Sequence, residues 1–161
     1  MLEWATGYFR QKEVESPRLS IEWLLAHTLD IKRLDLYLSY NRPLSPDELD
    51  RLRPLVKRRA EHEPLQYITG STEFLHTRIE VNNSVLIPRP ETEQLTENIL
   101  SAHPNEPPLK VLDVGTGSGC IAIALAFSRP SWQLQGIDVS AEALEIAANN
   151  ARANGVTVTF G

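Results

Sequence analysis

The sequence predicts an α/β protein with a small helical region first, a β-hairpin next, and then the opening of a doubly wound parallel sheet. Residues 110–127 have the pattern of a buried strand, a loop with glycine at every second position and an apolar helix. Residues 132–137 begin the same strand-to-helix pattern again. Alternating strands and helices are typical of a parallel sheet. Residues 1–60 instead carry apolar residues at helical spacing, which predicts the helical region.

Start signals define the helices of the N-terminal region. One helix is expected over residues 2–12, and another after Ser16-Pro17, an N-cap followed by a proline at the first helical position. Ser45 opens a capping box, Ser-Pro-Asp-Glu, before a third apolar stripe. Pro54 lies inside that stripe, so we expect the helix to kink or break there.

The sequence changes character after the third helix. Residues 74–81 and 85–87 are expected to pair as a β-hairpin around a turn at 82–84. A helix over residues 91–102 should then bury Leu95, Ile99 and Leu100, and a third parallel strand should occupy residues 156–160. The chain is therefore expected to divide into a helical domain (1–70), a β-hairpin linker (71–90) and a sheet domain (91–161).

Composition excludes several classes of protein. The chain has 161 residues, of which 42% are hydrophobic and 23% are charged, as in an average soluble domain. Its net charge of −5 provides no electrostatic footprint for nucleic acid, and no apolar run approaches the length of a membrane span. The single cysteine, Cys120, fits a reducing compartment, and we expect it to be a buried thiol. The four histidines lack metal-ligand spacing. We therefore expect a cytoplasmic protein with no membrane span, metal site or direct nucleic-acid binding.

The loop Asp113-Val114-Gly115-Thr116-Gly117-Ser118-Gly119 allows three interpretations. It could be a tight turn in which glycine only suits the backbone. It could bind a dinucleotide, but the Gly-x-Gly-x-x-Gly/Ala pattern would need glycine or alanine where Cys120 stands. The pattern acid-x-Gly-x-Gly-x-Gly, typical of S-adenosylmethionine sites, matches at every position. The third interpretation therefore fits best.

The two acids near this loop suit the same cofactor. The methionine end of S-adenosylmethionine carries an ammonium, which an acid can face, and a carboxylate, which backbone N–H groups can face. An acid after the second strand can accept hydrogen bonds from both ribose hydroxyls, although it could instead be an N-cap or first-turn acid of the next helix. The expected cofactor-binding residues are Asp113, Gly115, Thr116, Gly117, Ser118, Gly119 and Asp138.

Further motifs resemble a known family. Residues 86–93 read Leu-Ile-Pro-Arg-Pro-Glu-Thr-Glu, residues 63–70 read Glu-Pro-Leu-Gln-Tyr-Ile-Thr-Gly, and Ser-Pro-Arg-Leu begins at Ser16. Together with the glycine loop, they resemble the HemK/PrmC family of protein-glutamine methyltransferases. The resemblance implies a helical substrate-recognition domain, a β-hairpin linker and a seven-stranded Rossmann-like methyltransferase domain.

The same resemblance implies an activity and a partner. Members of the family transfer a methyl group from S-adenosylmethionine to the side-chain amide nitrogen of a glutamine. That glutamine lies in the Gly-Gly-Gln motif of peptide chain release factors, which are the expected partners, and we expect a monomer.

One family motif has no counterpart here. Asn-Pro-Pro-Tyr, which binds the substrate amide in the family, does not occur in the sequence, so no catalytic residue is assigned. We expect a fragment that ends within its third strand and is inactive alone. Two alternatives stay open: an amino-methyltransferase of nucleic acids with the same cofactor, and a non-catalytic module that binds release factors. The module could use a basic patch, or the patch could be a solvated helix face; its residues are Arg51, Arg53, Lys57, Arg58 and Arg59.

Overall fold

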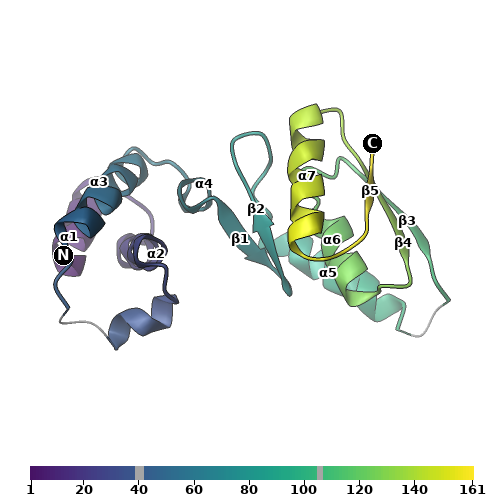
Figure 1. Ribbon diagram of the computed structural model, residues 1–161, viewed down its shortest axis with the longest axis horizontal. Helices are drawn as coiled ribbons and strands as arrows, with labels where there is room; N and C mark the ends of the chain where they lie inside the picture. The colour runs from purple at the N-terminus through teal and green to yellow at the C-terminus, as the bar shows by residue number, and fades with distance from the viewer. Residues whose placement is uncertain (39–41, 105–106) are drawn as a thin grey trace. The chain divides into compact units, whose positions relative to one another are not determined.

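The computed structural model describes residues 1–38, 42–104 and 107–161. The chain divides into two compact units, Met1–Thr69 and Gly70–Gly161 (Figure 1). The first unit is helical, and the second contains a two-stranded and a three-stranded sheet. Among the described residues, no helix combines the length and the apolar character needed to cross a bilayer.

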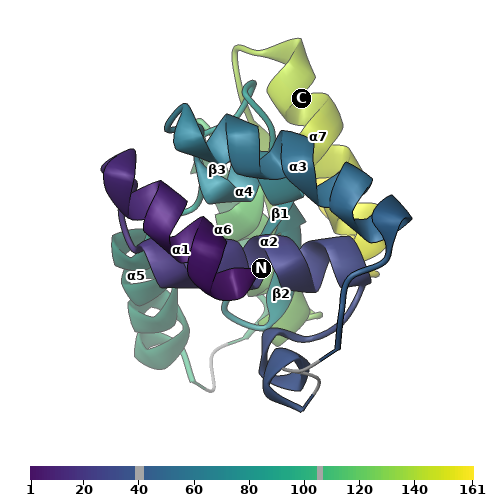
Figure 2. The ribbon, with the colours of Figure 1, turned by 90° about the vertical axis from the view of Figure 1, so that its left-hand side faces the viewer.

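The helical unit is built around one apolar core. In chain order its elements are α1 (Leu2–Gln11), α2 (Pro17–Leu29), the 3-10 helix η1 (Arg33–Tyr37), α3 (Pro46–Ala60) and α4 (Leu65–Thr69). Helix α2 packs against both α1 and α3, and Figure 2 shows these three helices facing the reader. The fully buried side chains between them are Ala5, Phe9, Ile21, Leu24 and Leu52. The apolar residues at helical spacing in residues 1–60 thus form a shared core between these helices.

The predicted N-cap is present at Ser45, whereas at Ser16 the helix begins as predicted but the side-chain cap is missing. The Ser45 hydroxyl accepts from Glu48 N at 3.2 Å, and Glu48 Oε2 accepts from Ser45 N at 2.8 Å, which is the predicted capping box. Ser16 precedes α2, but its backbone is left-handed and its side chain makes no capping hydrogen bond. The break considered at Pro54 does not occur, since α3 continues through it. Pro54 lies on the exposed face, where the carbonyl that loses its helical partner can bond to water.

The β-hairpin lies earlier in the chain than expected. Strand β1 (Ser71–Phe74) pairs antiparallel with β2 (Thr77–Glu80), and the two-residue turn falls at Leu75, not at 82–84. Residues 85–87 are not in a strand. The turn was missed because Leu75 takes a left-handed backbone (φ 51°) without the glycine or asparagine that usually marks such a turn. A carboxylate from α5 (Pro90–Ala102) compensates, since Glu93 Oε1 accepts from Leu75 N at 3.0 Å.

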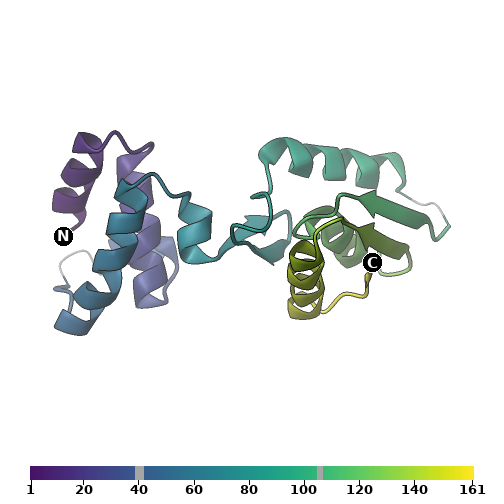
Figure 3. The ribbon, with the colours of Figure 1, turned by 90° about the horizontal axis from the view of Figure 1, so that it is seen from above.

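The second unit contains the parallel sheet that the sequence predicts. Its strands are β3 (Lys110–Val114), β4 (Gln133–Ile137) and β5 (Thr159–Phe160), in that order across the sheet, and Figure 3 shows the green arrows of β3 and β4 side by side. Helix α6 (Cys120–Ser128) connects the first two strands, and α7 (Ala141–Ala153) connects the last two. In the register, Val114 lies opposite Ile137, so β3 and β4 end together at one edge. The loops that follow both strands therefore meet there.

Two details of this unit differ from expectation. Leu95 is 52% exposed rather than buried, because the inward side of α5 carries Thr96, Ile99 and Leu100. Strand β5 is shorter than residues 156–160, although Val156 and Val158 pack against the core beside Leu134. Side-chain burial near β5 therefore extends further along the chain than strand pairing does.

Candidate functional site

The glycine loop lies at the carboxyl edge of the sheet, between β3 and α6. The Ile137 carbonyl at the end of β4 accepts from Gly115 N at 2.9 Å and from Thr116 N at 3.0 Å. The loop is thereby tied to the neighbouring strand as well as to its own. In open parallel sheets this edge is where ligands bind.

Glycine stands at three positions of the loop for different structural reasons. All three adopt left-handed backbones, with φ of 74° at Gly115, 53° at Gly117 and 79° at Gly119. A Cβ atom at Gly119 would lie 2.9 Å from Ile123 Cδ1 and 3.0 Å from Ala147 Cβ, so this glycine permits close packing against α6 and α7. At Gly115 and Gly117 the position of a Cβ atom has no heavy atom within 4 Å. The loop is therefore packed on its inner side and open on its outer side, where a ligand could approach the backbone.

Both predicted acids lie at this edge. Asp113 Oδ2 accepts a hydrogen bond from the Thr116 hydroxyl at 2.8 Å. Asp138 follows β4, and its Oδ2 accepts from Gly117 N at 2.8 Å while its Oδ1 accepts from Ser140 N at 3.0 Å. The N–H groups of Ser140 and then Gly117 lower the pKa of Asp138, so its carboxylate is charged at neutral pH. The carboxylate is thus ionised and oriented by backbone donors.

The helix-cap alternative for Asp138 is not what the structure has. Ser140 caps α7, because its hydroxyl accepts from Ala143 N at 3.1 Å.

All seven residues that were predicted to bind the cofactor lie at one edge of the sheet. They come from the end of β3, the loop and the residue after β4.

Two residues of this region were not predicted from the sequence. A Cβ atom at Gly136 would lie 2.7 Å from Thr116 Oγ1 and 2.8 Å from Phe160 Cε1, so glycine in β4 leaves room for Thr116 of the loop. Asn150 of α7 is buried and donates from Nδ2 to the Ser118 carbonyl at 2.9 Å. The signal for Asn150 was present in the sequence. It is a polar residue on the apolar stripe of α7, where it needs hydrogen-bond partners.

Cys120 begins α6 directly after the loop, and it is the buried thiol that was predicted. Burial raises its pKa to about 11, so it carries little thiolate at neutral pH. It therefore does not have the properties of a nucleophile.

Three of the five basic side chains in the patch of α3 bond to other residues of the helical unit. Arg58 Nε donates to Glu63 Oε2 at 2.7 Å. Arg59 donates to the Ser20 hydroxyl at 3.1 Å and to the Glu63 carbonyl at 2.9 Å. Arg53 pairs with Asp50 at the surface. These contacts favour a mainly structural role for the patch.

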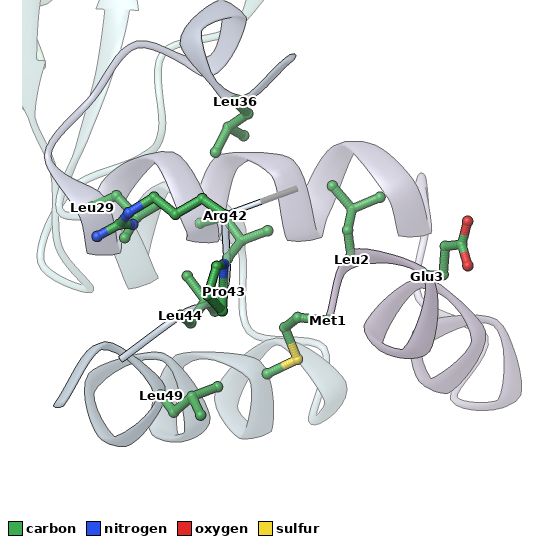
Figure 4. Close-up of a pocket in the computed structure, with 10 residues that line it drawn as sticks. Met1, Leu2, Glu3, Leu29, Leu36, Arg42, Pro43, Leu44 and Leu49 are labelled. Carbon is green, nitrogen blue, oxygen red and sulfur yellow. The ribbon is translucent and has the colours of Figure 1, made fainter. Parts of the chain in front are cut away.

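A cavity of about 380 Å³ lies in the helical unit. Leucine side chains and Met1 form much of its wall, and Arg42 reaches across it (Figure 4). It contains none of the predicted site residues. Within residues 1–38, 42–104 and 107–161, no three histidine, cysteine or acidic side chains are grouped to hold a metal ion.

Comparisons with known proteins agree with this geometry. Residues 1–70 match the family model of the PrmC N-terminal domain, and residues 105–161 match that of a methyltransferase domain. The chain is 46% identical over 160 residues to a release factor glutamine methyltransferase of Geobacter sulfurreducens, an alignment that covers 99% of this chain and 56% of that protein. It is 43% identical over 162 residues to the same enzyme of Chlorobaculum tepidum, covering 98% of this chain and 55% of that protein.

A solved structure is more distantly similar. The Pyrococcus abyssi tRNA (uracil-54, C5)-methyltransferase aligns with a TM-score of 0.47 and 19% identity, over 56% of this chain and 22% of its own, which is too distant to bear on function.

The chain spans about half the length of the curated relatives it matches. On the two domain matches and these identities, the chain belongs to the HemK/PrmC family, and both of these relatives are named release factor glutamine methyltransferase.

Proposed function

We propose that the second unit binds S-adenosylmethionine at the glycine loop, and that the protein methylates a glutamine of peptide chain release factors. The observation that carries the cofactor assignment is the arrangement at one sheet edge. An open glycine backbone lies there between two acids, and one of these acids is ionised and held by two backbone N–H groups. The acceptor assignment rests on the names of the relatives.

The residues present fit the parts of this cofactor. Each oxygen of Asp138 uses one lone pair for a backbone donor and retains another, with which it could accept from a ribose hydroxyl. The open backbone at Gly115 and Gly117 and the first amides of α6 suit the methionine carboxylate. Asp113 suits the ammonium. When bound, the cofactor supplies an electrophilic methyl group on a sulfonium.

The remaining assignments concern the substrate, the roles of the domains and the state of the protein in the cell. An amide nitrogen is a weak nucleophile because its lone pair is delocalised, so methyl transfer depends on how precisely the protein positions the substrate. We assign recognition of the release factor to residues 1–70, the linker to 71–90 and cofactor binding to 91–161. We also propose a cytoplasmic monomer that does not bind nucleic acid, in line with the net charge of −5 and the single cysteine.

Calorimetric titration tests the cofactor assignment. The chain should bind S-adenosylmethionine and S-adenosylhomocysteine but not NAD. Asp138→Ala should weaken binding about 10- to 100-fold, because two hydrogen bonds to a charged acceptor are lost. Glu145→Gln, an exposed acid on α7, is the matched control and should leave the affinity unchanged. Equal binding by the Asp138→Ala variant would remove Asp138 from the site.

A methyl-transfer assay with the protein at the length of its relatives tests the acceptor. Radiolabel should enter a release factor and should be lost when the glutamine of its Gly-Gly-Gln motif is replaced. Label in RNA rather than in the release factor would instead support the nucleic-acid alternative.

A further inference from the structure

Asn150 connects three separate segments of the second unit. Its side chain is 0% exposed. Its Oδ1 accepts from Glu80 N at 2.7 Å, and its Nδ2 donates to the Glu80 carbonyl at 3.0 Å and to the Ser118 carbonyl at 2.9 Å. One buried amide on α7 thus bonds strand β2 of the hairpin and the glycine loop at the same time.

Asn154 lies one helical turn later and bonds the same strand in the same way. Its Oδ1 accepts from Arg78 N at 3.1 Å, and its Nδ2 donates to the Arg78 carbonyl at 2.8 Å. The two asparagines therefore pair with the outer edge of β2 much as a neighbouring strand would, which protects an otherwise open edge. They differ in one respect: the hydrogen bond to the loop comes from Asn150, whereas the third bond of Asn154 goes to the Asn150 carbonyl.

The loop depends on α7 at the point where Asn150 reaches it. Ser118 is buried, and its neighbour Gly119 packs so closely on Ala147 of α7 that a Cβ atom would not fit. The hydrogen bond to the Ser118 carbonyl sets the orientation of the peptide between Ser118 and Gly119. Because Gly117 lies beside it, that orientation also affects the loop segment that donates to Asp138.

We propose that Asn150 is a positioning residue for the cofactor site, and that it couples ligand binding at the loop to the hairpin. This inference rests on the proposed function, since it takes the loop to be where S-adenosylmethionine binds. Asn150 holds the inner side of the loop so that the outer side keeps its binding geometry. A ligand that orders the loop in turn strengthens the hydrogen bonds between Asn150 and Glu80.

Affinity for S-adenosylhomocysteine tests the positioning role, with Asn154 as the matched control. Asn150→Ala should weaken binding about tenfold, because it leaves the Ser118 carbonyl buried without its donor. Asn154→Ala removes equivalent bonds to β2 but none to the loop, so its affinity should stay within about twofold of the unsubstituted chain. Equal affinities for both variants, whether weakened or unchanged, would overturn the proposal.

Hydrogen exchange of the unsubstituted chain tests the coupling without any substitution that could impair folding. S-adenosylhomocysteine should slow exchange of the Glu80 amide, which Asn150 holds, more than that of the Arg78 amide, which Asn154 holds. A merely structural asparagine would not make exchange at Glu80 depend on a ligand at the loop. Slowed exchange in the loop with no change at Glu80 would refute the coupling. Absence of binding to the unsubstituted chain would instead refute the proposed function, and this inference with it.

Discussion

The two units of this chain bury their apolar residues in different ways. In the helical unit, α1, α2 and α3 surround a core in which Phe9, Leu24 and Leu52 are fully buried. In the second unit, the helices pack against the side of the sheet that carries Leu134. Leu112 and Val114 of β3 point to the other side and are 55% and 72% exposed. The helical unit therefore surrounds its core with helices, whereas the parallel sheet of the second unit has one face covered by helices and Leu112 and Val114 exposed on the other face.

From this difference we expect the stability of the two units to have different sources. Helix-on-helix packing in the first unit is supplied by apolar side chains between Ala5 and Ile68. In the second unit, one-sided burial is supplemented by polar contacts between distant segments, such as those of Asn150 and Asn154. We therefore expect the helical unit to fold independently and the second unit to be the less stable. The candidate cofactor site lies in the second unit, so a bound ligand should stabilise that unit by an amount set by its concentration and affinity.

The largest expected effect is that of emptying the helical core. Phe9→Ala should lower the free energy of unfolding of the helical unit by about 3–5 kcal/mol, because it leaves a cavity among α1, α2 and α3. Denaturation followed by circular dichroism reports the helices of both units, so a circular-dichroism transition that the fluorescence lacks belongs to the helical unit. Fluorescence of Trp132 in a Trp4→Phe, Trp23→Phe background reports the second unit.

The fluorescence transition should not move with Phe9→Ala. Leu34→Ala, at an exposed position of η1, is the control and should change neither transition. If both transitions shifted together, the two units would not unfold independently.

A smaller effect is expected at the loop of the second unit. Gly119→Ala should cost about 2–4 kcal/mol, because the left-handed backbone is unfavourable for alanine and the new methyl group would meet Ile123 and Ala147. Gly155→Ala has a left-handed backbone as well but open space, and it should cost about 1 kcal/mol. Urea denaturation followed by Trp132 fluorescence measures both. Equal costs would mean that close packing of the loop on α7 contributes little.

The smallest expected effect concerns a buried carboxylate in the helical unit. Burial tends to raise the pKa of Glu22, but hydrogen bonds from Arg18, Arg33 and Tyr37 outweigh burial and lower it below its ordinary value of 4.5. Glu22→Gln should therefore destabilise the unit at pH 7 by about 1–2 kcal/mol.

The pH dependence of this effect follows from the direction of the shift. A lowered folded-state pKa stabilises the protein fully above the unfolded-state pKa, and this stabilisation is lost as pH falls through the folded-state value. The difference between Glu22→Gln and the unsubstituted chain should shrink below about pH 4.5. A difference that stays constant from pH 7 to pH 3 would contradict an ionic origin. Asp138→Asn, at the more exposed loop, should mainly change ligand affinity instead.

Prediction from the sequence was most accurate where structure is decided locally. The capping box at Ser45 and the strand–loop–helix around Gly115 to Gly119 were both predicted from short patterns. It failed at the hairpin, where Leu75 turns the chain without glycine and is held by Glu93 from a later helix. It also failed at Leu95, because the apolar side of α5 is chosen by what packs against it.

The sequence by itself determined the order of the elements, the glycine loop and the two acids that flank it. These depend on backbone preferences and on spacing along one stretch of chain, and both are visible in the residues. Only the tertiary structure decided the register of the hairpin, the need for glycine at Gly136 and the partners of Asn150. Asn150 and Glu80 lie 70 residues apart. A contact at that separation exists only after the sheet, the loop and α7 have packed together, so no local pattern encodes it.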